Sequence, residues 1–394
     1  MKEESKKLLI FLDKHFKKLN MNGEFSNGVN TLLSEIFERM KSSQEKIYET
    51  SFLKYSDVIE NSNFDYMPQK IKDEIHQMNK TATVFEFKVR GRKFKINIIH
   101  YDMSSNKIHE FVKRIFMWFY IISFYAPTNC SQQLNINLYL TNIKKTLPTI
   151  DNTFIEQEHA NTAFTTSCQQ HTEINIFREE EWFKVLIHES FHCMGLDFSE
   201  FEQNDIDKKI LKIFPIKSDV RLFETYCEMW GEIINVMFIC YFSSKQKNIP
   251  TMISKSNKML CYERVFSMFQ CVKVLNHFNL KYKNLYEKTK NDEVIRKNYK
   301  EKTQIFSYYV LKCIYMYNLN EFIEWCNIHN NGSLNFDKSN ENYKSNVHGY
   351  IGFIEKNYKK NDYLECLNKI EYFFLKRNDE SFEMNTMRMS LFEM

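Results

Sequence analysis

The sequence predicts an α+β fold that is predominantly helical and contains one small mixed sheet. Glycine (8 residues) and proline (5 residues) are scarce, so few tight turns are encoded. Apolar residues recur at helical spacing near the start of the chain and throughout its second half, and short alternating stretches lie between these parts. The length of 394 residues and the 43% of hydrophobic residues indicate a globular protein with a sizeable buried core.

Three regions follow from this pattern. Residues 1–80 are expected to form a helical N-terminal region, residues 81–245 a core that contains the sheet, and residues 246–394 a helical C-terminal region packed on that core. The helical spacing at the N-terminus is that of Leu8, Leu9, Leu12, Phe16 and Leu19, followed by Leu32, Leu33, Ile36, Phe37 and Met40.

Alternation of apolar and polar residues predicts four strands. Thr83–Arg90 and Lys93–Ile99 flank a Gly-Arg turn and are expected to pair as a hairpin. Leu134–Leu140 and Thr172–Phe177 alternate in the same way, with apolar side chains on one face. The other expected elements are a buried helix at Lys107–Tyr125 and a mostly helical chain from Phe183 onward.

Charge and cysteine usage limit the partners and the compartment. The 54 basic and 50 acidic residues are interleaved and leave a net charge of +4, which argues against a nucleic-acid partner. Ten cysteines without a CxxC pair indicate buried free thiols in a reducing compartment. The longest uncharged apolar stretch, Ile115–Ala126, is too short to span a membrane, and Leu8–Leu12 is too short for a signal peptide. We therefore expect a soluble protein of the cytoplasm or another reducing intracellular compartment.

One motif predicts chemistry. Residues 188–192 read His-Glu-Ser-Phe-His, which on a helix places His188 and His192 on one face, where both can bind one zinc ion. Glu189 then lies beside the metal and can take a proton from a zinc-bound water. Chance would produce this motif in roughly 3% of such chains. The surrounding residues are apolar, and the alternative is a pair of hydrogen-bonded core histidines without a metal.

A catalytic zinc ion usually has a third protein ligand. The predicted helix at Lys217–Phe242 offers Glu224 and Glu228, which are four residues apart and share a face. One carboxylate could bind zinc, and the other could accept the free ring N–H of a zinc-bound histidine. The alternative is a solvated row of glutamates on an amphipathic helix.

Residues 160–240 resemble the zincin superfamily of metallopeptidases, and within it the gluzincins. Those enzymes carry HExxH on one helix and a glutamate ligand on a following helix, commonly as ExxxD. The resemblance implies that His188, His192 and Glu224 bind zinc and that Glu189 is the catalytic base. Glu228 stands where the family often has aspartate, and it would orient a ligand histidine.

The resemblance also implies a fold and a function. Gluzincins have an edge strand just before the HExxH helix that pairs with an extended substrate; Thr172–Phe177 is placed for that strand, and residues 161–164 are candidates for the same sheet. The implied protein is a zinc metallopeptidase with a zincin-like domain, long helical extensions and a peptide or protein substrate. The Lys- and Asn-rich composition and the Gly195–Phe198 run also resemble zincin-like proteins of large DNA viruses, which implies a location in a host cell or virion.

Alternatives remain within and outside the superfamily. Metzincins read HExxHxxGxxH or end in aspartate; here Gly195 fits, but Phe198 occupies the last position and Asp197 comes one residue early. A zincin-fold structural or interaction protein that keeps the metal site, and a helical binding protein with an accidental motif, are the other two. Further candidate site residues are His348 and Tyr350 as oxyanion stabilisers, His159 and His171 in the cleft, and Cys168 as an inhibitory thiolate or, preferably, a buried structural cysteine.

Overall fold

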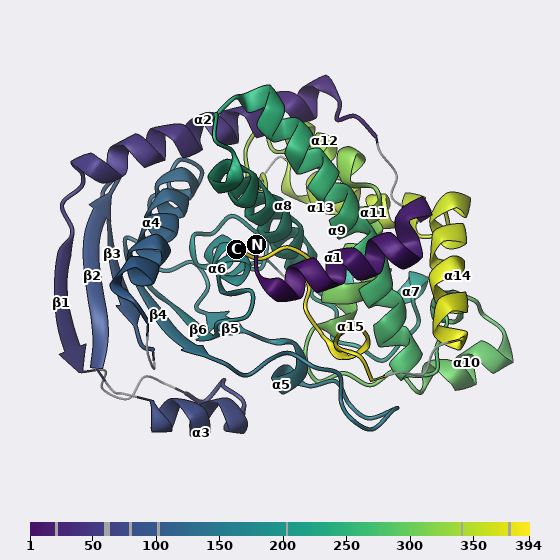
Figure 1. Ribbon diagram of the computed structural model, residues 1–394. Coiled ribbons are helices and arrows are strands. Elements are labelled where there is room, and N and C mark those ends of the chain that lie inside the picture. Colours follow the sequence, from purple (N-terminus) through teal and green to yellow (C-terminus); the bar gives the residue numbers. More distant parts are fainter. Residues whose placement is uncertain are drawn as a thin grey trace.

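A computed structural model of the chain contains one six-stranded mixed sheet and a large helical part (Figure 1). It describes residues 1–19, 23–58, 64–78, 81–100, 103–201, 204–339, 342–376 and 380–394. The strand order is β1-β2-β3-β4-β6-β5. The strands are β1 (Leu53–Val58), β2 (Thr81–Val89), β3 (Arg92–Ile98), β4 (Gln133–Thr141), β5 (Ala163–Thr165) and β6 (His171–Arg178). The predicted α+β fold class is therefore confirmed.

The pairing of the strands confirms the hairpin and corrects one edge of the sheet. β2 and β3 are antiparallel, β3, β4 and β6 run parallel, and β5 returns antiparallel to β6. The expectation that β6 is the edge strand before the motif helix is wrong, because β5 lies outside it. β5 has only three residues, too few to show an alternating pattern in the sequence.

The opposite edge holds a second correction. Residues 1–80 were expected to be helical, yet β1 pairs with β2 along the outer edge of the sheet. Five of its six side chains are exposed, so the strand lacks the alternation that a half-buried strand shows. The remainder of this region is helical where described, as α1 (Glu3–Phe16), α2 (Asn27–Glu49) and α3 (Gln69–Gln77).

Helices bury both faces of the sheet. α3 covers one face together with a small cluster of apolar side chains that includes Ile71 and Ile75. α2, α4 (Ser105–Ile122) and α6 (Trp182–Cys193) lie on the other face (Figure 1). α4 confirms the buried helix predicted at Lys107–Tyr125.

α6 continues the packing into the helical part of the molecule. It lies against α8 (Leu222–Ser243), in which every residue from Leu222 to Tyr241 is buried. α9 (Ile249–His277) packs on α8 in turn. The other helical elements are η1 (Lys17–Leu19), α5 (Gln157–Ala160), α7 (Asn204–Ile213), η2 (Tyr282–Leu285), α10 (Lys290–Arg296), η3 (Phe306–Leu311), α11 (Lys312–Tyr317), α12 (Leu319–His329), α13 (Tyr343–Asn357), α14 (Asn361–Leu375) and α15 (Phe382–Asn385). No helix in the described part of the chain is both long and apolar enough to cross a membrane.

Eight cysteines are free and buried, as predicted. Cys130 and Cys168 instead form a disulfide, so Cys168 is neither an inhibitory thiolate nor a free buried thiol. The sheet explains this pairing. β4 and β6 are parallel neighbours with Gln133 opposite His171, and each cysteine precedes its strand partner by three residues. The two thiols are therefore brought side by side by a register that only the folded sheet defines.

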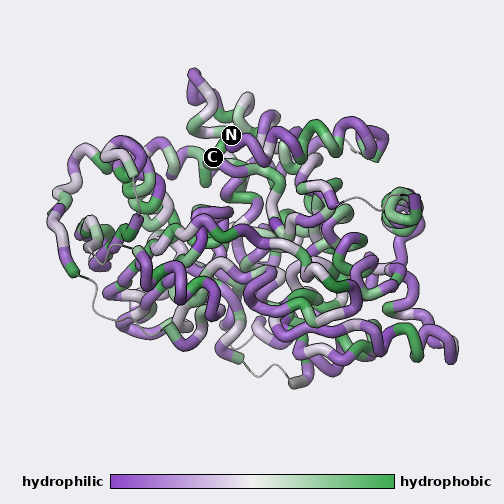
Figure 2. Tube along the Cα trace, turned by 60° about the horizontal axis from the view of Figure 1, so that its bottom comes forward, coloured by the Kyte–Doolittle hydropathy of each residue, from purple (hydrophilic) through white to green (hydrophobic). Residues whose placement is uncertain are grey.

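The C-terminal segment, residues 386–394, runs through the interior between the helices. Thr386 to Glu393 are all buried, although the segment belongs to no sheet beyond one isolated bridge. Side chains bind its backbone: the Glu181 carboxylate accepts the N–H groups of Met389 and Ser390, and Glu263 accepts those of Leu391 and Phe392. The segment ends beside the N-terminus, where the Lys2 N–H donates to the Glu393 carbonyl (Figure 1, Figure 2).

We expect Glu181→Gln to loosen this segment and to remove part of the pH dependence of stability. Burial opposes ionisation, but Lys145 and Arg388 lower the pKa of Glu181 from 4.5 to about 2. A carboxyl whose pKa falls on folding stabilises the folded chain above its ordinary pKa, and that contribution is lost as the pH falls from 4.5 to about 2. At neutral pH the variant should lose about 3 kcal/mol of unfolding free energy.

Denaturant titrations at a series of pH values between about 7 and 3 measure this loss. The wild type should lose unfolding free energy more steeply than Glu181→Gln below pH 4.5. Glu3→Gln, which changes an exposed carboxylate on α1, is the control and should follow the wild type. Parallel curves for Glu181→Gln and the wild type would contradict the assignment.

Candidate metal centre

Helix α6 places the motif residues at the boundary between the sheet and α8. All twelve of its residues are buried, because the helix is apolar on every side and packs on β5, β6 and α8. It ends before Gly195, which has a φ of +68° and confirms the predicted cap. A side chain at Gly195 would also bring a Cβ atom within 2.6 Å of the Cys130 sulfur. The turn after the motif therefore requires glycine for two reasons.

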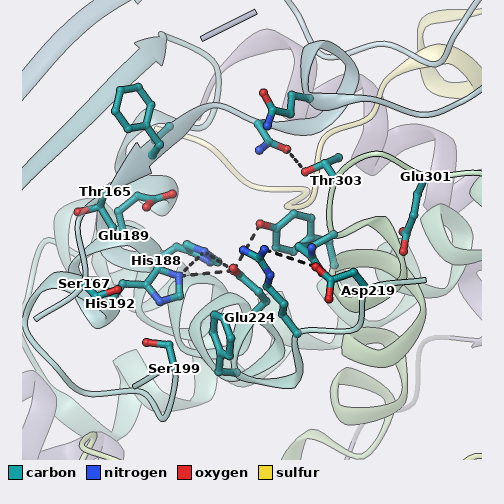
Figure 3. Close-up of a pocket in the computed structure, with 18 of the residues that line it drawn as sticks. Thr165, Ser167, His188, Glu189, His192, Ser199, Asp219, Glu224, Glu301 and Thr303 are labelled. Atoms are coloured by element: carbon teal, nitrogen blue, oxygen red, sulfur yellow. Dashed lines mark hydrogen bonds and ion pairs between the residues drawn. The ribbon is translucent and has the colours of Figure 1, made fainter. Parts of the chain in front are cut away.

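Three donor atoms converge where α6 faces α8 (Figure 3). The Nε2 atoms of His188 and His192 lie 3.2 Å apart. Glu224, in the first turn of α8, places Oε2 at 3.1 Å from the His188 Nε2 and at 3.4 Å from the His192 Nε2. By this geometry His188, His192 and Glu224 form a group that could hold a metal ion.

Two further carboxylates contact the opposite nitrogens of the same imidazoles. Glu228 Oε1 lies 2.9 Å from the His188 Nδ1, as an ion-pair contact without full hydrogen-bond alignment. Asp197 Oδ2 contacts the His192 Nδ1. The Cys227 sulfur lies 3.5 Å from that same Asp197 oxygen.

Asp197 thus lies behind His192 rather than beside the converging Nε2 atoms. His192, Asp197 and Cys227 are also close enough together to hold a metal ion. We interpret Asp197 instead as the group that orients His192, because its oxygen contacts the Nδ1 position and a neutral imidazole has one ring N–H to donate. The metzincin alternative would need Asp197 on the same side as the two Nε2 atoms, and the structure does not place it there.

The carboxylates control the charge of the two histidines. Burial favours the neutral imidazole, but Glu228 and Glu224 raise the pKa of His188 to about 9. Against the same effect of burial, Cys227 and Asp197 raise the pKa of His192 well above its ordinary value. Protonated imidazoles thus balance the buried carboxylates here, and a metal cation would supply the positive charge in their place.

Glu189 lies on the wall of a cavity of about 720 Å³ that also reaches His188, His192 and Glu224 (Figure 3). Burial raises the pKa of its carboxyl, and the neighbouring histidines partly oppose this. A carboxyl with a raised pKa is a better proton acceptor near neutral pH than an exposed one.

Tyr308 is a cavity residue that the sequence did not identify. Its hydroxyl lies 3.3 Å from Glu224 Oε2, and its ring is 6.1 Å from the His188 ring. Burial, followed by Glu224 and Glu189, raises the pKa of Tyr308 well above 10, so the hydroxyl keeps its proton. The residue begins an apolar stretch typical of a core helix, and only the wider π-helical turn of η3 reveals a functional position.

The two predicted oxyanion stabilisers lie elsewhere. His348 is exposed and lines a different cavity on α13. Tyr350 is fully buried, and its hydroxyl lies 2.9 Å from that of Thr225, on the far side of α8 from the donor atoms. His171 and His159 also fail to reach the cavity: His171 is exposed on β6, and His159 Nδ1 accepts the N–H of Glu156 in α5. Sequence neighbours of a glycine or of the motif do not determine which helix face meets the site.

Comparisons with known proteins do not supply a family for this arrangement. The side chains that converge on His188 and His192 are therefore the basis for assigning a function. No protein-family model, curated protein or solved structure matches the chain.

Proposed function

We propose that the protein is a zinc-dependent metallopeptidase. The observation that supports this best is the triangle of donor atoms from His188, His192 and Glu224, whose sides measure 3.1, 3.2 and 3.4 Å. Ligands held at about 2.0–2.1 Å from a tetrahedral zinc ion lie about 3.3 Å from one another. Two imidazoles and one carboxylate are also ligands that zinc accepts in catalytic sites, with a fourth position left for water.

Zinc, when bound, would polarise a peptide carbonyl and lower the pKa of a nearby water. Glu189 accepts the proton of the attacking water and passes it to the leaving amine. The Tyr308 hydroxyl keeps its proton and donates to the oxygen on which negative charge develops. Glu228 and Asp197 hold the two histidines in orientation.

The cavity offers a place for an extended peptide. Ala163, Phe164 and Thr165 of β5 line it, and β5 is the last strand at this side of the described sheet. An edge strand can bind a peptide backbone as an added strand. Such a peptide would pass close to Glu189, where the scissile bond has to lie.

Zinc content is the first test. Purified protein after mild dialysis should contain close to one zinc ion per chain by elemental analysis, because the three donors are already assembled. His192→Ala removes one donor and should lower this content sharply, whereas His348→Ala alters an exposed histidine outside the site and should not. A folded wild-type chain that has never met a chelator and contains no zinc would exclude the proposal.

Peptide cleavage is the second part of that test. Hydrolysis of a peptide library should stop on chelation and return when zinc is added back. Zinc binding without cleavage of any peptide would favour the alternative, a structural or interaction protein that retains the metal site.

A further inference from the structure

A buried lysine lies directly behind the candidate metal centre. Lys184 is one helical turn before His188 on α6, and its side chain is 1% exposed. Its ammonium contacts Glu228 Oε2 and lies 3.9 Å from the sulfur of Met389 in the C-terminal segment. A buried ammonium is costly unless it is paired, so this position has a reason in the charge of Glu228.

The two oxygens of Glu228 have different partners. Lys184 contacts Oε2, while Oε1 lies 2.9 Å from the His188 Nδ1. Because a carboxylate is planar, an ammonium that fixes one oxygen also fixes the direction of the other. Lys184 and His188 share one face of α6, so Glu228 reaches across from α8 to both.

The charge around the site requires a cation in addition to the metal. Four buried carboxyl groups, those of Glu189, Asp197, Glu224 and Glu228, surround the two histidines. A divalent ion would balance only part of this charge. Lys184 supplies a permanent positive charge on the side of Glu228 away from His188.

We propose that Lys184 is a positioning residue of the metal centre. It holds Glu228 ionised and oriented, so that His188 keeps its proton on Nδ1 and presents Nε2 to the metal. This role rests on the proposed metal centre, and it concerns the affinity and geometry of metal binding rather than a contact with substrate.

The test compares metal affinity in full-length variants. Zinc and Co²⁺ dissociation constants are measured by competition with a chelator, and the visible spectrum of bound Co²⁺ reports ligand geometry. Lys184→Met should weaken both ions about 10- to 100-fold, as losses behind a metal ligand commonly do, and should alter the Co²⁺ spectrum. Lys145→Met is the matched control, because Lys145 is equally buried and pairs with Glu181 at the start of α6 rather than with Glu228.

A double variant separates positioning from general stability. Once Glu228→Gln has removed the negative charge, Lys184 has nothing left to orient. Adding Lys184→Met to Glu228→Gln should then change the affinity by no more than about twofold, the usual scatter for uncoupled effects. If Lys184→Met alone does not fold, this comparison decides by itself, because the double variant contains no unpaired ammonium or carboxylate at this contact.

The outcomes are distinct. A wild-type chain that binds neither ion overturns the metal centre and this role together. A wild-type chain that binds zinc while Lys184→Met binds it equally well, or loses no more affinity than Lys145→Met, overturns the positioning role alone. A further loss of affinity on adding Lys184→Met to Glu228→Gln also overturns it.

Discussion

Replacing Glu224 by alanine should abolish tight zinc binding. The Glu224 carboxylate supplies the third donor of the triangle, and burial fails to neutralise it, because His192 and His188 keep the pKa of Glu224 far below its ordinary range. Without it, two imidazoles would hold the ion with two positions open to the cavity. The zinc dissociation constant, measured by chelator competition, should rise by far more than 100-fold, the upper end for losses that act through another ligand.

Glu228→Ala is the matched comparison for Glu224→Ala. It removes a carboxylate from the same helix, one turn away, that contacts His188 on the opposite nitrogen. Zinc binding should weaken by about 10- to 100-fold only. The reverse order of the two effects would show that the roles of Glu224 and Glu228 have been exchanged.

The second large effect concerns catalysis. Glu189→Gln keeps the shape of the side chain but removes the proton acceptor, so peptide hydrolysis should fall by about 10²-fold or more. Zinc content should stay at the wild-type level, because Glu189 is not among the three converging donors. Initial rates on a cleaved peptide, with elemental analysis of the same samples, measure both quantities.

Glu158→Gln is the control for this substitution. It makes the same chemical change at an exposed carboxylate in α5 that does not line the cavity, and its rate should equal that of the wild type. Equal rates for wild type and Glu189→Gln would remove Glu189 as the base. Loss of zinc from Glu189→Gln would instead mean that its carboxylate contributes to metal binding.

Local periodicity predicted the parts of the site that lie on single helices. A spacing of four residues places His188 beside His192, and Glu224 beside Glu228, in any α-helix. The apolar residues between them predicted that both helices are buried, which the structure confirms. The strands β2, β3, β4 and β6 were likewise visible as alternation, because each has a buried face.

Features that depend on contacts between distant segments could not be predicted in this way. Tyr308 reaches the cavity only because η3 packs on α8, more than 80 residues earlier in the chain. Lys184 read as one charge in an apolar helix until Glu228 was placed opposite it. The position of Asp197 behind His192 depends on the turn at Gly195, which the sequence predicted as a cap without indicating where the following carboxylate would lie.

The burial of residues 386–394 sets an order of events during synthesis on the ribosome. α6 and α8 carry the donor atoms, but the segment whose backbone neutralises Glu181 and Glu263 is translated roughly 140 residues after α8 ends. At about 5–20 residues per second, this leaves a delay of about 7 to 30 seconds. During that interval the nascent helices hold buried carboxylates without their final partners, so a rigid metal centre is among the last parts of the molecule to form.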